Sequence, residues 1–147
     1  MFELPNIPNL GGNSNPLMAN MCDYVGKLEG LRFKFKILHW GVVNLPYTGK
    51  KGLHEYLDEF VDKINDYYDA IVEGISGICD SNINLTDISI QECPINTLPE
   101  LIKYIESITI DYYDSLPDIT KYKGITSRIE VFLEDIDSYK YKFNITK

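Results

Sequence analysis

Residues 53–73 read LHEYLDEFVDKINDYYDAIVE and contain the pattern that decides the fold. Apolar side chains recur at alternating spacings of three and four, which places them on one face of an α-helix. They are Leu53, Leu57, Phe60, Ile64, Tyr67 and Ile71. The spacing predicts an amphipathic helix from about Gly52 to Ser76 or Ile78, with one apolar face to bury.

Three further segments show the same spacing and predict three more helices. The first begins at Asn15-Pro16, because asparagine accepts from unpaired amides and proline suits the first turn, and it runs to about Trp40. A later helix begins at the capping-box sequence Thr97-Leu-Pro-Glu100 and ends before Pro117. The last helix has an inner face formed by Ile125, Ile129, Phe132, Ile136, Tyr139 and Phe143.

The segments between these helices predict their arrangement. Residues 41–51 contain glycines and a proline and predict a loop. Residues 79–96 are rich in Asp, Ser and Asn and are too long for a hairpin connection, which favours a crossover between opposite sides of a bundle. The predicted fold class is therefore all-α, a ferritin-like four-helix bundle over residues 15–147 with a long connection between its second and third helices.

Small and apolar residues predict two contacts of this domain. Gly26 and Gly30, in the first helix, indicate a close contact with another helix. Residues 1–14 are rich in Pro, Gly and Asn and predict an irregular N-terminal arm. We expect this arm to strap onto a neighbour through its four large aliphatic and aromatic side chains, Phe2, Leu4, Ile7 and Leu10.

The composition of the 147-residue chain excludes several classes of function. Asp and Glu number 22 against 14 Lys and Arg, so the net charge is −8. Direct DNA binding is disfavoured, because it depends on cationic side chains that displace phosphate counterions. Cys22, Cys79 and Cys93 form no C-x-x-C pair and predict buried thiols in a reducing compartment. With no leader-like or membrane-length apolar segment, we expect a cytoplasmic protein of a bacterium or phage-infected cell.

The second helix carries candidate metal ligands on its polar face. His54, Asp58, Asp69 and Glu73 point at about 0°, 40°, 60° and 100° around that helix, whereas its apolar residues lie at about 220–300°. The ends of this set are roughly 28 Å apart, so they cannot share a metal within one straight helix. Two copies packed antiparallel across a two-fold axis near residues 63 and 64 would bring opposite ends together. Imidazole and carboxylate suit iron(II), manganese or zinc.

Three short motifs resemble the ferroxidase region of the Dps proteins, the miniferritins named as DNA-binding proteins of starved cells. They are Leu38-His-Trp40, Leu53-His-Glu-Tyr-Leu-Asp58 and Asp69-x-x-x-Glu73. In that family a His-Trp closes the first helix, a His-x-x-x-Asp opens the second, and an Asp-x-x-x-Glu begins fifteen residues after that histidine, as it does here. The resemblance implies five site residues: His39, His54 and Asp58 from one subunit, and Asp69 and Glu73 from its two-fold mate.

The resemblance also implies a function. It implies a homododecameric shell that oxidises iron(II) with hydrogen peroxide or oxygen, stores iron(III) inside and protects against oxidative stress. Trp40 is expected as a redox neighbour of the site, and Asp135 and Asp137 are expected near an iron-entry pore. The chain departs from the family in its longer loop after the first helix and in lacking the lysine-rich tail that binds DNA in some members. The alternative is a structural bundle protein of a larger, phage-type assembly with a vestigial or static metal site.

Overall fold

The computed structural model describes residues 15–42 and 50–145, and these residues are helical over most of their length. Helix α1 spans Pro16–Gly41, α2 spans Lys50–Cys79, α3 spans Leu98–Ser115 and α4 spans Lys123–Ile145, with the short 3-10 helix η3 at Thr120–Tyr122. No strand occurs among the described residues, which confirms the all-α prediction. The predicted arm at residues 1–14, and residues 43–49 of the predicted loop, lie outside the described residues.

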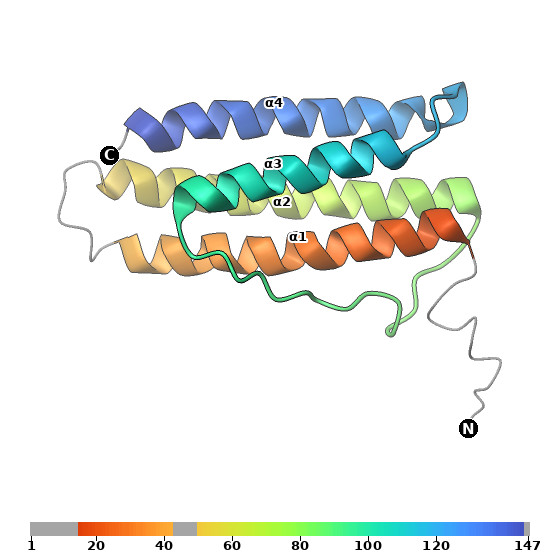
Figure 1. Ribbon diagram of the computed structural model, residues 1–147, viewed down its shortest axis with the longest axis horizontal. Helices are drawn as coiled ribbons and strands as arrows, with labels where there is room; N and C mark the ends of the chain where they lie inside the picture. Colours follow the sequence, from red (N-terminus) through yellow and green to blue (C-terminus); the bar gives the residue numbers. More distant parts are fainter. Residues whose placement is uncertain (1–14, 43–49, 146–147) are drawn as a thin grey trace.

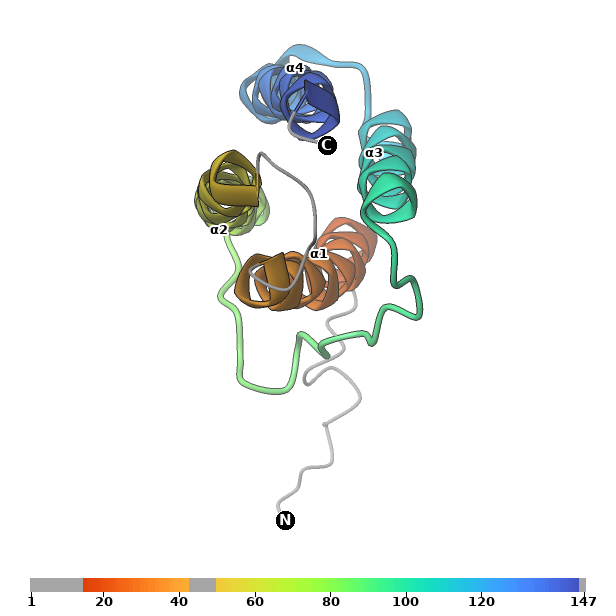
Figure 2. The ribbon, with the colours of Figure 1, turned by 90° about the vertical axis from the view of Figure 1, so that its left-hand side faces the viewer.

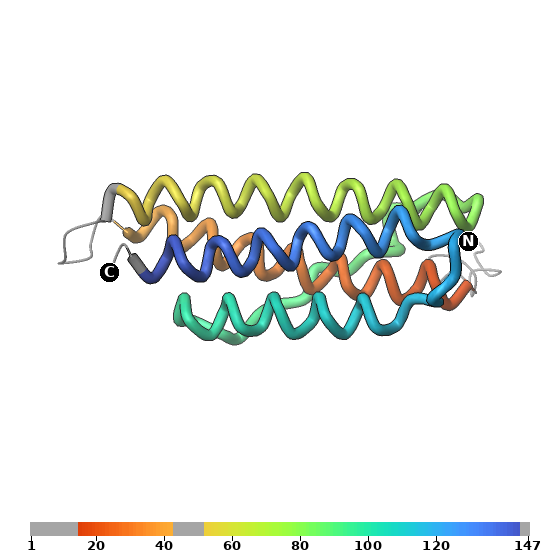
Figure 3. Tube along the Cα trace, turned by 90° about the horizontal axis from the view of Figure 1, so that it is seen from above, coloured from red at the N-terminus to blue at the C-terminus, as the bar shows by residue number. Residues whose placement is uncertain are grey.

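The four helices occupy the corners of a square when the bundle is viewed end-on (Figure 2). Helix α1 packs against α2 and α3, and α4 packs against the same two helices from the other side. Helices α1 and α4 run in one direction and α2 and α3 in the other (Figure 1). Seen from above, α4 lies between α2 and α3 (Figure 3). Because α2 and α3 are parallel, residues 80–97 must return along the length of the bundle, and they do so beside α1.

Local chemistry accounts for where the helices begin and end. Asn15 Oδ1 accepts a hydrogen bond from the Leu17 amide at 2.8 Å, as the predicted start of α1 requires. Helix α2 ends at Cys79, one residue past the later of its two predicted ends, and Asp80, with φ 50°, takes the left-handed conformation that closes it. At α3 the capping-box prediction was wrong in detail: Thr97 Oγ1 donates to Glu100 Oε1 at 3.0 Å, so the side chains bond each other and not the backbone amides.

Residues 80–97 approach α1 closely at the two glycines. A Cβ atom added to Gly26 would lie 2.2 Å from the Ser89 carbonyl oxygen, and one added to Gly30 would lie 1.9 Å from the Gln91 carbonyl oxygen. The Gln91 amide also donates to the Gly26 carbonyl at 3.1 Å. The predicted close contact is therefore present, but its partner is the connecting segment. The expectation of a neighbouring helix was wrong. A glycine without a Cβ atom allows the close approach of any backbone, whether it belongs to a helix or to a loop.

The core is built from the apolar faces that the sequence predicted. Every predicted inner-face residue of α2 and α4 is buried, whereas Leu17 and Leu38 of α1 are only partly buried. Aromatic rings fill the centre, where Tyr67 stacks on Phe132 with 3.8 Å between ring centroids. Cys22 and Cys93 are buried, Cys79 is partly buried, and all three are free thiols.

A polar cluster links three helices inside this core. Tyr24 Oη hydrogen-bonds with Tyr67 Oη at 2.9 Å and with Thr109 Oγ1 at 2.8 Å. The Tyr112 ring stacks on Tyr24 with centroids 4.3 Å apart, but its hydroxyl has no hydrogen-bond partner among the described residues. Burial raises the pKa of Tyr24 and of Tyr112. The buried hydroxyls of Tyr24, Tyr67 and Thr109 therefore satisfy one another and hold α1, α2 and α3 in register.

No helix within the described ranges 15–42 and 50–145 is both long enough and apolar enough to cross a bilayer.

The contact between residues 80–97 and α1 can be tested by replacing one glycine with alanine. Gly30→Ala places a methyl group against backbone, so we expect the free energy of unfolding to fall by about 1–3 kcal/mol. Gly77→Ala is the matched control, because nothing lies within 4 Å of its added Cβ, and it should raise stability by roughly 0.5–1 kcal/mol. Urea denaturation measures both changes. Equal effects of the two substitutions would show that the connecting segment does not sit on Gly30.

The polar cluster can be tested with two tyrosine substitutions that each remove one hydroxyl. Tyr24→Phe leaves the buried hydroxyls of Tyr67 and Thr109 without their shared partner, so we expect a loss of about 1–3 kcal/mol. Tyr112→Phe removes a hydroxyl that makes no described hydrogen bond and should leave stability unchanged or slightly higher. Thermal and urea unfolding compare the two variants. A cost for Tyr112→Phe as large as that for Tyr24→Phe would contradict this account of the cluster.

Candidate metal centre

Three of the five predicted ligands meet at one end of the bundle. Helices α1 and α2 are antiparallel, so the last turn of α1 lies beside the first turns of α2. There, His39 Nδ1 lies 2.9 Å from the backbone oxygen of His54, and His39 Nε2 lies 3.9 Å from Asp58 Oδ1. The two imidazole rings are 3.9 Å apart, centroid to centroid, and tilted by 35°. The His39 side chain is only 12% exposed, whereas Asp58 is 55% exposed and opens to solvent.

The backbone contact determines which nitrogen of His39 carries the proton. A carbonyl oxygen can only accept, so Nδ1 is the donor, and Nε2 is the nitrogen whose lone pair could bind a metal when the ring is neutral. This lone pair lies on the side of the Asp58 carboxylate. Two donor atoms that bind one metal at about 2.0–2.2 Å each lie roughly 3–4 Å apart. The His39–Asp58 separation therefore suits a shared divalent cation, and the pair meets the first requirement of a metal site.

The other two predicted ligands lie far along α2. Asp69 and Glu73 are exposed and follow His54 at a distance of about 22 Å or more along the helix. They line a separate pocket of about 320 Å³, together with Glu29, Tyr68 and the connecting segment. Within the described part of a single chain, no three His, Cys, Asp or Glu side chains gather closely enough to hold a metal ion. The structure thus places the five residues in two separate groups, and the intersubunit site stays a prediction.

A hydrogen-bonded network beside Asp69 and Glu73 was not predicted from the sequence. Arg32 donates to both carboxylate oxygens of Glu29, from Nε at 2.8 Å and from Nη2 at 2.7 Å, and Tyr68 Oη donates to the same carboxylate. The hydrogen bonds from Arg32 are the main cause that lowers the pKa of Glu29, so this carboxylate stays ionised. The only signal in the sequence is the i, i+3 spacing of Glu29 and Arg32. The network supports the turn of α2 from which Asp69 projects.

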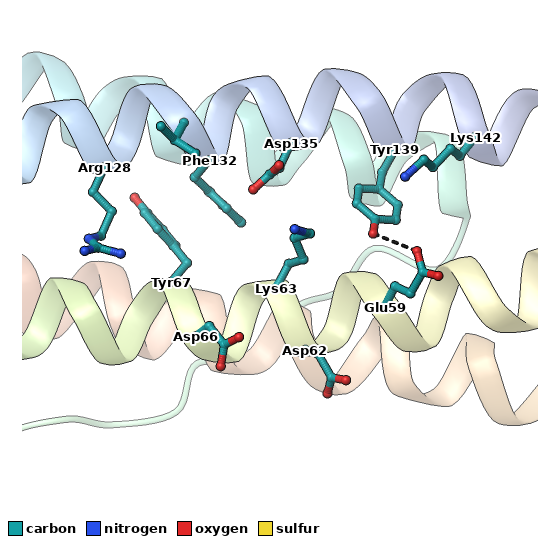
Figure 4. A pocket seen from close by; sticks show the side chains of 11 residues that line it. Glu59, Asp62, Lys63, Asp66, Tyr67, Arg128, Phe132, Asp135, Tyr139 and Lys142 are labelled. Carbon is teal, nitrogen blue, oxygen red and sulfur yellow. Dashed lines mark hydrogen bonds between the residues drawn. The ribbon is translucent and has the colours of Figure 1, made fainter.

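The remaining predicted site residues lie in different surroundings. Trp40 is 58% exposed at the end of α1, directly after His39. Asp135 projects from α4 toward α2 into a pocket of about 610 Å³ with charged and aromatic walls (Figure 4). Asp137, two residues further on, lies 3.5 Å from Lys140 Nζ, an ammonium that also contacts Glu106 of α3. The two acids therefore face different neighbouring helices, as expected for residues about 200° apart on a helix.

Comparisons with known proteins provide no further guide to this site. No protein-family model, no curated protein and no solved structure matches the chain. The function must therefore be inferred from the residues and their geometry.

Proposed function

We propose that the chain is a Dps-like ferroxidase that oxidises iron(II) at a site shared by two subunits and stores iron(III) inside a hollow homo-oligomer. The observation that carries this proposal is the position of the His39 ring, which contacts the His54 backbone oxygen through Nδ1 and places Nε2 3.9 Å from the Asp58 carboxylate. The helix directions support a ferritin-like bundle, because that architecture also joins two parallel helices by a long connection.

In this proposal the site is completed by a second subunit. Asp69 and Glu73 are exposed on the side of α2 that faces away from its own core, so they are available to a partner. An antiparallel two-fold pairing of α2 near residues 63 and 64 would set them against the His39–His54–Asp58 group of that partner. Neutral imidazoles would fix the geometry, and three carboxylates would offset the charge that grows as iron(II) becomes iron(III).

The ligand set suits iron as the substrate of a redox reaction. Two iron(II) ions each lose one electron, and one hydrogen peroxide takes up both electrons and two protons to become two water molecules. Oxygen and nitrogen ligands accommodate both oxidation states, and few protein ligands for each iron leave positions free for the oxidant. The net charge of −8 on each chain favours the approach of cations and opposes direct binding to DNA.

The proposal is tested by removing the carboxylates that the second subunit would supply. We expect Asp69→Ala/Glu73→Ala to oxidise iron(II) no faster than buffer containing peroxide, whereas the wild type is much faster. The measurement is the growth of iron(III) absorbance after mixing protein, iron(II) and peroxide. The matched control is Asp111→Ala/Asp114→Ala, which removes two exposed carboxylates from α3, a helix that supplies none of the proposed ligands, and it should retain the rate.

Two results would contradict this proposal. One is a wild-type rate no higher than that of the Asp69→Ala/Glu73→Ala variant. The other is a native mass that shows a monomer, where the proposal expects a closed particle of about twelve 16.9 kDa chains. A monomeric or open assembly without iron oxidation would favour the structural bundle with a vestigial or static site.

A further inference from the structure

An exposed apolar stripe runs along the last turns of α1. Phe33, Ile37 and Trp40 share one face of the helix and are 53%, 44% and 58% exposed. The rings of Phe33 and Trp40 meet edge to face with centroids 6.3 Å apart, so the stripe is a continuous surface. Large apolar side chains that gather on a surface mark an interaction site more often than scattered ones do.

The stripe borders a hollow that suits aliphatic side chains. Ile37 forms one wall of an apolar hollow of about 380 Å³, whose lining residues are Ile37, Leu38, Gly41, Val42, Leu53, Leu57 and Leu98. Lysines flank the stripe: Lys36 Nζ lies 5.9 Å from the centroid of the Trp40 ring, and Lys34 Nζ donates to Asn96 at 2.6 Å. The surface therefore fits an apolar peptide segment that carries no cationic side chain.

The chain itself contains such a segment before α1. Residues 1–14 have five large apolar side chains, counting Met1, a single acidic residue, Glu3, and no Lys or Arg. The described part of the chain begins at Asn15, the N-cap of α1, so this segment starts from a known point. Fully extended, fourteen residues reach about 45 Å. Length and chemistry thus both allow this segment to cover the stripe.

The position of Asn15 indicates that the stripe is covered by residues 1–14 of a second copy of the chain. Two contacts align the antiparallel helices α1 and α2: His39 meets His54, and Glu29 meets Tyr68. Residues 63 and 64 of α2 therefore lie beside about residues 30–33 of α1. Measured along the bundle axis, a two-fold axis at that level places the partner's Asn15 roughly 10 Å beyond Trp40. The chain's own Asn15 lies about 27 Å from Phe33 along α1, with the backbone of residues 89–91 seated on the helix between them.

We propose that residues 1–14 of each subunit dock on the Phe33–Ile37–Trp40 stripe of its two-fold mate, anchored by Phe2, Leu4 and Ile7. This inference rests on the two-fold pairing in the proposed function and adds a second link between the same two subunits. The arm covers the outer side of Trp40, directly next to the ligand His39.

Trp40 is the single tryptophan of the chain, so its fluorescence reports on the stripe. In the full-length chain, Phe2→Ser/Leu4→Ser/Ile7→Ser should shift the emission to longer wavelength and increase quenching by acrylamide, because the ring becomes exposed to water. The matched control, Asn6→Ser/Asn9→Ser/Asn13→Ser, changes three polar residues of the same arm and should leave both readouts as in the wild type. Unchanged fluorescence of the apolar variant would overturn the proposal.

Mixing two variants decides which copy supplies the arm. Subunits with the three apolar-to-Ser changes keep Trp40, and full-length Trp40→Phe subunits supply an intact arm without tryptophan fluorescence. Exchange between them should restore the protected emission, with mixed assemblies confirmed by native mass. No restoration in such assemblies would show that each arm acts within its own chain and would overturn docking on the mate.

Iron oxidation by the wild type is measured separately. An active wild type whose Trp40 emission does not respond to the arm variants overturns the docking of the arm alone, whereas an inactive monomer overturns the proposed function.

Discussion

The parallel direction of α2 and α3 is the constraint on which the rest of the structure depends. Two consecutive parallel helices cannot be joined by a short turn, so residues 80–97 must travel back along the bundle. This backbone needs a place to lie, and Gly26 and Gly30 provide it by leaving two positions of α1 without a side chain. The outer face of α1 is thereby divided. Its middle contacts the connecting segment, and its last turns present the stripe that begins at Phe33.

The predicted ligands lie in two groups, one near each end of the contact between α1 and α2. At one end, the antiparallel pairing of α1 and α2 brings His39 Nδ1 onto the His54 carbonyl, which orients the imidazole so that Nε2 lies toward Asp58. At the other end, Glu29 and Tyr68 bridge the same two helices beside Asp69. Both groups are built on long, rigid helices, but the length of α2 keeps them apart. In the proposed function each chain would hold two half-sites, which a two-fold pairing would combine.

Much of this architecture is predictable from local pattern, because burial of one helix face imposes a periodicity that the sequence must contain. The inner faces of α2 and α4 and the start of α1 at Asn15 belong to this class. Contacts between distant segments do not. The spacing of Gly26 and Gly30 shows that something approaches α1 closely, but not that the approaching backbone is a loop. The Tyr68–Glu29 bond and the left-handed Asp80 depend on tertiary geometry that leaves no periodic trace in the sequence.

The central claim is that one subunit supplies the imidazoles and another supplies the distal carboxylates, and complementation between variants tests it most directly. His54→Ala and Glu73→Ala chains each lack one ligand, from opposite halves of the site. In a mixed dimer, one of the two sites takes all its ligands intact, with His54 from one chain and Glu73 from the other. The account predicts that the mixture regains iron(II) oxidation that neither variant shows alone. Mixed assemblies that form, as judged by native mass, but oxidise iron(II) no faster than the separate variants would contradict it.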